Sequence, residues 1–209
     1  CFDKVAKESK KKPVIFSISF GSLLALKVAT DSQRAQQVST LLLYGGYGQW
    51  LSTCQTLLQK RDLNNQKYIC DPRVYPVLFL HILDKVFVDQ TLEERLKFEK
   101  LLRTFILKTW HDDRFDHIEK LKELAQEISS DLSKHDRNLF MIACGIHEPL
   151  FDFYKTYLND KDFNYLNPLS EISSLQCKCI IFHSADDSVI PVEQFSILCK
   201  KIPAQYIKH

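Results

Sequence analysis

Five residues near the start of the chain have the types and spacing for nucleophilic chemistry, Ser17-Ile-Ser19-Phe-Gly21. They follow an apolar, β-rich run that begins at Pro13 and predicts a buried central strand, and they precede a small aliphatic run that predicts a helix. Small neighbours two residues before and after Ser19 suit a tight strand-to-helix turn, where the two backbones nearly touch. Ser19 is therefore a candidate nucleophile, and the Phe20 amide at the helix N-terminus could form half of an oxyanion hole.

The alternative for Ser19 is structural. Serine is favoured near the start of a helix, where its hydroxyl can accept hydrogen bonds from free amides. The five residues alone do not separate the two interpretations.

A second candidate group lies near the C-terminal end, in the segment His183-Ser-Ala-Asp-Asp187-Ser-Val-Ile-Pro191. It follows an apolar run from Cys177 that predicts a strand, and it leads into a helix predicted from about Pro191 to Lys201. A carboxylate on such a loop can accept a hydrogen bond from a histidine, fix its tautomer and stabilise the imidazolium ion. Asp187 stands four residues before the proline; the alternative is an ordinary loop aspartate near a helix start.

The two groups together resemble the α/β-hydrolase family. The first is similar to the family's G-x-S-x-G nucleophile elbow, with Ser17 in place of the first glycine, and the second is similar to its acid loop. The order also matches, because the serine comes first and the acid second, each after a parallel strand, with a helical insertion between them. The resemblance implies a serine hydrolase with a helical cap, in which Ser19 and Asp187 are catalytic, Phe20 donates to the oxyanion, and no cofactor or metal takes part.

The resemblance also implies a catalytic histidine in the loop after the next strand. That strand is expected at Ala204 to Lys208, so the base is expected beyond residue 209, with His209 as a weaker candidate. The second oxyanion amide is expected upstream of Cys1. The chain is thus expected to be an internal fragment that exposes a sheet edge and is inactive or insoluble by itself. His183 is expected to be structural, and packing or surface roles are expected for His81, His111, His117, His135 and His147.

The elements that must position these residues form an α/β core in two pieces. The strand, the helix Phe20 to Ala29 and a strand at Val38 to Tyr44 make a βαβ unit, which predicts a mostly parallel sheet flanked by helices. From Gln49 to about Asp162 the pattern is helical, with a capping box at Thr91 to Glu94. We expect residues 1–48 and 166–209 to form the α/β core and residues 49–165 to form an all-helical cap. An amphipathic helix face is predicted at Ile118, Leu121, Leu124, Ile128 and Leu132.

The composition is that of an ordinary globular protein, with 45% apolar and 26% charged residues among 209. A formal charge of +2 argues against a nucleic-acid partner, and the run Lys10 to Lys12 is expected to be a solvated helix end. The seven cysteines lack metal-like spacing, and Cys177 and Cys179 are expected to be small buried side chains. The odd count, with no leader and no membrane-spanning segment, predicts a cytoplasmic protein.

Three functions stay open. The first is a carboxylesterase-like or thioesterase-like hydrolase that forms an acyl-enzyme on Ser19 from a small hydrophobic acyl substrate. The second is an acyltransferase on the same scaffold, and the third is a non-catalytic binding protein with this fold. Haloalkane and epoxide chemistry is disfavoured, because those branches have an aspartate at the Ser19 position. Candidates for an apolar acyl pocket, most of them expected to be cap core, are Phe79, Leu80, Ile82, Phe98, Phe105 and Phe140.

Overall fold

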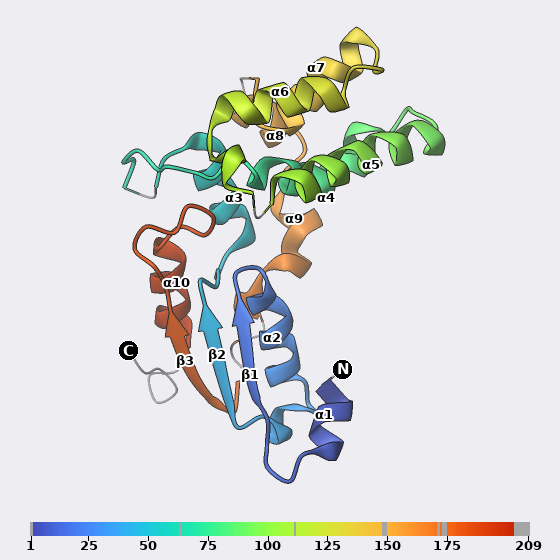
Figure 1. Ribbon diagram of the computed structural model, residues 1–209. Coiled ribbons are helices and arrows are strands. Elements are labelled where there is room, and N and C mark those ends of the chain that lie inside the picture. Colours follow the sequence, from blue (N-terminus) through green and yellow to red (C-terminus); the bar gives the residue numbers. More distant parts are fainter. Residues whose placement is uncertain are drawn as a thin grey trace. The chain divides into compact units, whose positions relative to one another are not determined.

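A computed structural model describes residues 2–62, 64–110, 112–147, 150–170, 172 and 175–202 of the chain. The chain divides into two compact units. The first, called the core unit here, comprises Cys1–Ile69 and Asp160–His209; the second, the helical unit, comprises Cys70–Asn159. The strands labelled in Figure 1 belong to the core unit.

The core unit is an α/β structure built on a three-stranded parallel sheet, as the sequence predicts. The strands lie in the order β1-β2-β3, and they are β1 Val14–Ile18, β2 Thr40–Tyr44 and β3 Lys178–Phe182. Their register places Ile18, Tyr44 and Phe182 side by side at the carboxyl ends. The loops that follow the three strands therefore begin at the same edge of the sheet, which is where the candidate residues of the core unit are found.

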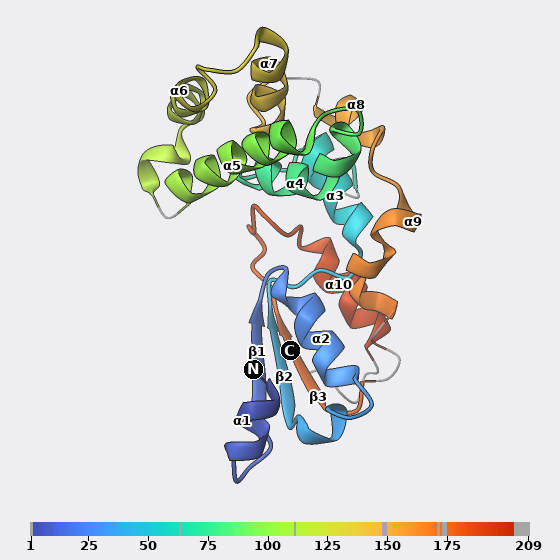
Figure 2. The same cartoon turned by 90° about the vertical axis from the view of Figure 1, so that its right-hand side faces the viewer.

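Two helices cover one face of this sheet, α2 Gly21–Thr30 and α10 Glu193–Lys201 (Figure 2). The core between them and the strands contains fully buried side chains of all these elements: Leu26, Ala29, Leu41, Leu43, Cys179 and Leu198. Cys177 and Cys179 are both buried there, which confirms the structural interpretation of this pair. Burial raises the pKa of the Cys179 thiol to about 12, so this cysteine does not supply a reactive thiolate near neutral pH.

The opposite face of the sheet is apolar and exposed. The apolar pattern of β1 is that of a buried central strand, but β1 is an edge strand of the described sheet, in line with the sheet edge that the sequence is expected to expose. The large side chains of this exposed face are Val14, Phe16, Ile18, Tyr44 and Phe182, which are 46–60% exposed. An apolar run of this kind is typical of a strand covered on both faces, but the described residues cover only one.

We expect this exposed face to bind an apolar fluorescent dye, because such dyes bind contiguous apolar surface. Patches of this kind are unusual on soluble monomers. A double substitution, Phe16→Lys with Ile18→Lys, should reduce the dye signal strongly. Leu24→Lys is the matched control, since Leu24 is 68% exposed on α2, outside this face. Dye fluorescence at constant protein concentration measures the effect; an equal loss with Leu24→Lys would contradict it.

Short helices complete the core unit. They are α1 Phe2–Glu8, η1 Ala35–Gln37, α3 Trp50–Gln59, α9 Asp160–Phe163, η3 Asn164–Leu166 and η4 Pro168–Ser170. The sequence places α3 in the helical insertion, whereas the compact units group it with the sheet. Lys10, Lys11 and Lys12 follow α1 and are exposed, as expected for a solvated helix end.

The described part of the helical unit is built from helices around an aromatic core. The elements are α4 Val74–Val86, α5 Leu92–Thr109, η2 Asp113–Asp116, α6 Ile118–Ile128, α7 Lys134–Ala143 and α8 Leu150–Lys155. The capping box at the start of α5 is confirmed, because Thr91 and Glu94 exchange side-chain and backbone hydrogen bonds. The amphipathic face of α6 is confirmed in part: Leu121 and Leu124 are buried, but Ile118 is 48% exposed.

Candidate active site

Ser19 occupies the tight turn that joins β1 to α2. Its backbone has φ +54°, in the left-handed region that residues other than glycine rarely adopt. The Ser19 amide donates to the Tyr44 carbonyl at 2.8 Å, and the Ser19 carbonyl accepts from the Ser22 amide at 3.1 Å. The turn is thus fixed on the strand side and on the helix side. A strained serine between a strand and a helix has the backbone form of a nucleophile elbow.

The helix-capping alternative for Ser19 is not supported. The N-cap residue of α2 is Phe20, and the start of this helix has no side-chain cap hydrogen bond. The Phe20 amide donates to no other residue in the described part of the chain. An unoccupied amide at a helix N-terminus can bind an anion or a developing oxyanion, as the sequence predicts for Phe20.

The spacing between Ser17 and Gly21, on either side of the Ser19 turn, is less tight than the sequence predicts. A β-carbon built on Gly21 would lie 3.8 Å from the Ser17 β-carbon, which is an ordinary van der Waals contact. The two backbones therefore leave room for a β-carbon at both positions at once. This spacing explains why Ser17 is accommodated where the family pattern has a glycine.

Asp187 lies in the loop after β3, and its carboxylate is oriented by backbone amides. Oδ1 accepts hydrogen bonds from Val189 at 2.8 Å and from Ile190 at 2.9 Å. Oδ2 lies beside Gly45, whose φ is +59° and where a β-carbon would approach this oxygen to 3.1 Å. Gly45 directly follows β2, so the acid lies over the end of the strand next to the one that carries Ser19.

Asp186, the neighbouring carboxylate, has a different environment. It is exposed, and its carboxylate accepts a hydrogen bond from the Ser184 hydroxyl. That hydrogen bond lowers the pKa of Asp186 below its usual value. Asp187 is the better candidate acid, because one of its two oxygens is held by the loop and the other is left for a histidine.

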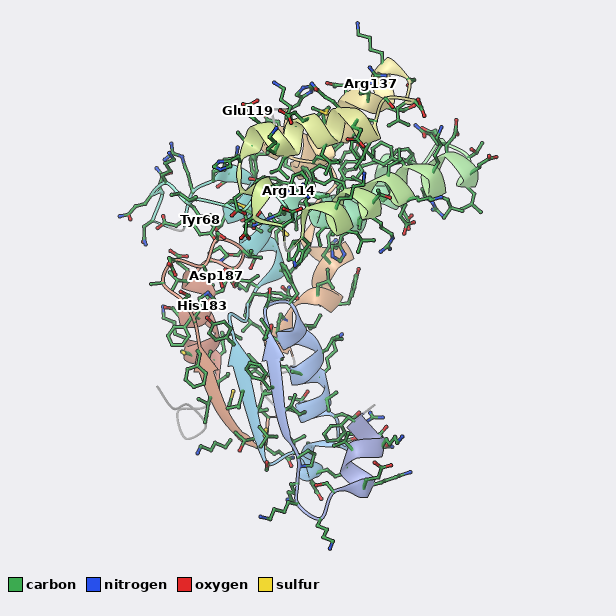
Figure 3. The ribbon with its side chains drawn as sticks, in the orientation of Figure 1. Tyr68, Arg114, Glu119, Arg137, His183 and Asp187 are labelled. Atoms are coloured by element: carbon green, nitrogen blue, oxygen red, sulfur yellow. The ribbon has the colours of Figure 1, made fainter. Side chains whose placement is uncertain are left out.

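Two residues that the sequence did not predict for the site hold the acid loop. Figure 3 labels them, His183 and Tyr68, close to Asp187 near the upper end of β3. His183 Nε2 lies 2.8 Å from the Ile190 carbonyl oxygen, and the Tyr68 hydroxyl donates to the Asp187 carbonyl at 2.6 Å. The structural role expected for His183 is consistent with this contact. Tyr68 has no sequence signal, because its partner is 119 residues away.

Several predicted positions lie outside the described residues: Cys1, His111, the strand Ala204 to Lys208 and His209. The candidate base and the second oxyanion donor therefore stay predictions.

The predicted acyl-pocket residues are mainly core of the helical unit. Phe79, Ile82, Phe105 and Phe140 are fully inaccessible and Phe98 is 2% exposed, while Leu80 is half-buried. The rings pack on one another, with centroids 5.7 Å apart for Phe98 and Phe140. An open groove of about 580 Å³ in this unit is lined by other residues, with charged side chains of both signs around Phe115 and Leu124.

Neither a metal cluster nor a membrane-crossing helix occurs in the described part of the chain. No three His, Cys, Asp or Glu side chains described here could hold an ion together. The described helices are too short or too polar to span a bilayer.

The buried hydroxyl of Ser22, just after the elbow, has no hydrogen-bond partner within the described residues, and the residue is fully inaccessible. We expect Ser22→Ala to raise the free energy of unfolding by about 1 kcal/mol, because an unsatisfied buried hydroxyl is removed. Ser39→Ala is the matched control and should be destabilising, since the Ser39 hydroxyl donates to the Pro13 carbonyl at 3.0 Å. Denaturant unfolding of both variants measures the difference; a destabilised Ser22→Ala would contradict it.

Comparison with known proteins gives no match, either to a family model or to a curated protein. A functional proposal therefore has to start from the geometry of the turn at Ser19 and of the loop that carries Asp187.

Proposed function

We propose that this protein is a serine hydrolase of the α/β-hydrolase type that cleaves ester or thioester bonds. The helical unit would be the cap of this hydrolase. The enzyme would recognise its substrate by a hydrophobic acyl group. The observation that supports this proposal most strongly is the left-handed backbone of Ser19 on the turn between β1 and α2. A strained residue that also has a nucleophilic side chain is typical of catalytic sites.

In the proposed reaction the Ser19 hydroxyl oxygen attacks the carbonyl carbon of the substrate. A histidine takes the hydroxyl proton and passes it to the leaving alcohol or thiol as the acyl bond breaks. The Phe20 amide stabilises the negative charge on the carbonyl oxygen. Water then attacks the acyl-enzyme, releases the carboxylic acid and restores the serine hydroxyl. Asp187 fixes the histidine tautomer through its Oδ2 oxygen.

The proposed partners are small acyl molecules, and the proposed chemistry uses no cofactor. The odd number of cysteines supports a reducing compartment, and the cytoplasm is the proposed location.

Ester hydrolysis by the intact protein tests the proposal. p-Nitrophenyl esters with acyl chains of increasing length should be hydrolysed with saturation, and kcat/KM should rise with chain length if the acyl group is bound in an apolar site. Transfer to an added alcohol faster than to water would identify an acyltransferase. A folded protein that hydrolyses none of these esters or their thioester analogues, and transfers no acyl group, would contradict the enzyme proposal in favour of a binding protein.

A further inference from the structure

We infer that Tyr68 and His183 are positioning residues that clamp the acid loop and hold the Asp187 carboxylate in place. The inference rests on the proposed function, in which Asp187 must keep one oxygen free for a histidine. Both residues contact backbone atoms of the loop, one at the acid itself and one three residues further on. Neither residue takes a direct part in the proposed reaction.

Tyr68 reaches the loop from a hydrogen-bonded segment whose described residues are 60–62 and 64–68. The Tyr68 amide donates to the Lys60 carbonyl at 2.9 Å, and Arg61 pairs with Lys67 in an antiparallel bridge. Inside this segment, Asp62 Oδ1 accepts from the amides of Asn64 and Gln66 at 2.9 and 2.7 Å. The Tyr68 hydroxyl is therefore presented from a hydrogen-bonded base, and its bond to the Asp187 carbonyl fixes the backbone of the acid.

His183 holds the other end of the loop, at Ile190. Its side chain is 1% exposed, and its Nε2 donates to Ile190, since a carbonyl oxygen can only accept. The Ile190 amide in turn donates to Asp187 Oδ1, so the histidine and the acid hold the same residue from opposite sides. Nε2 also lies 3.8 Å from Asp187 Oδ2, beyond direct hydrogen-bond distance. The ring therefore supports the loop without occupying the free oxygen of the acid.

Substitutions at Tyr68 and His183 can remove the two contacts with the loop one at a time. Tyr68→Phe removes only the hydroxyl, and Tyr165→Phe is its control, because Tyr165 is 59% exposed in the same unit. His183→Leu removes the donor to Ile190. His183→Gln is the rescue variant, since the amide nitrogen of glutamine can occupy the position of Nε2 and donate to the same carbonyl.

The expected result has two parts, measured on the intact protein. Hydrolysis of a p-nitrophenyl ester should lose about 10- to 100-fold in kcat with Tyr68→Phe and His183→Leu, with KM unchanged, as for groups that orient a catalytic residue. His183→Gln and Tyr165→Phe should retain the wild-type kcat. Hydrogen exchange of the Val189 and Ile190 amides should become faster in the same two variants, because both amides donate to Asp187 Oδ1.

The outcomes separate this inference from the function it rests on. If the wild type is active, and kcat and amide exchange are unchanged in Tyr68→Phe and His183→Leu, then these residues do not hold the acid loop. That result would leave the hydrolase proposal intact. Faster exchange together with a fall in kcat that His183→Gln reverses would support the positioning role of these residues. If the wild type hydrolyses nothing, the proposed function fails, and the exchange rates of the two amides still decide whether the clamp exists.

Discussion

Ser19→Gly should abolish ester hydrolysis and leave the protein more stable than Ser19→Ala does. Both variants remove the proposed nucleophile, so kcat should fall by about 10⁴-fold or more in each. They differ in the backbone, because Ser19 has φ +54°, a conformation that costs an L-residue about 1–2 kcal/mol and glycine nothing. The backbone strain that glycine removes is larger than the free-energy cost of its greater unfolded-state entropy, which is about 0.4–1 kcal/mol.

Paired measurements test this expectation. Denaturant unfolding should give Ser19→Gly a free energy of unfolding about 1 kcal/mol above that of Ser19→Ala. Initial rates of ester hydrolysis should be at background for both. A glycine variant less stable than the alanine variant would show that the turn is not strained, and hydrolysis retained by either would exclude Ser19 as the nucleophile.

Asp187→Asn should cost about as much activity as the loss of the nucleophile, roughly 10⁴-fold in kcat, while leaving the fold nearly unchanged. Asparagine keeps an oxygen that can accept from the amides of Val189 and Ile190, so the loop should hold its conformation. It replaces the Oδ2 oxygen by an amide that cannot accept a hydrogen bond from a histidine. In this variant, kcat is therefore expected to fall while the free energy of unfolding stays nearly the same.

Asp187→Ala provides the comparison. It removes both accepted hydrogen bonds, and we expect a loss of about 2 kcal/mol in the free energy of unfolding in addition to the loss of activity. Asp186→Asn is the matched control on the adjacent residue, which is exposed and should change neither quantity strongly. Wild-type kcat in Asp187→Asn would exclude Asp187 as the acid, and a large effect of Asp186→Asn would move that role to its neighbour.

The strands, and the positions of Ser19 and Asp187 in the loops after β1 and β3, were predictable because their signals are local. A run such as Val14–Ile18 shows its strand preference within a few residues, and Ser19 stands directly after it. Parallel strands that follow a βαβ pattern bring their carboxyl ends to one edge, which accounts for the placement of Asp187 on the same side of the sheet.

What the sequence did not predict depends on distant contacts. Tyr68 and Asp187 are far apart in the chain, and no spacing rule connects the segment around Tyr68 to the acid loop. The exposed face of β1 was missed for a related reason, since the apolar side chains of Phe16 and Ile18 predict cover on both faces but not which residues supply it. The distance between the Ser17 β-carbon and a β-carbon built on Gly21 depends on how closely the two backbones approach. The sizes of the residues alone do not determine that distance.

Covalent labelling of Ser19 tests the central claim most directly. The intact protein would be incubated with a fluorophosphonate, which reacts with activated serines, and the modified peptide would be mapped by mass spectrometry beside Ser19→Ala. We expect a single modification at Ser19, lost in the alanine variant and strongly slowed in Asp187→Asn. A folded protein that is not labelled, or that is labelled equally in Ser19→Ala, would contradict the assignment of this turn as a catalytic nucleophile elbow.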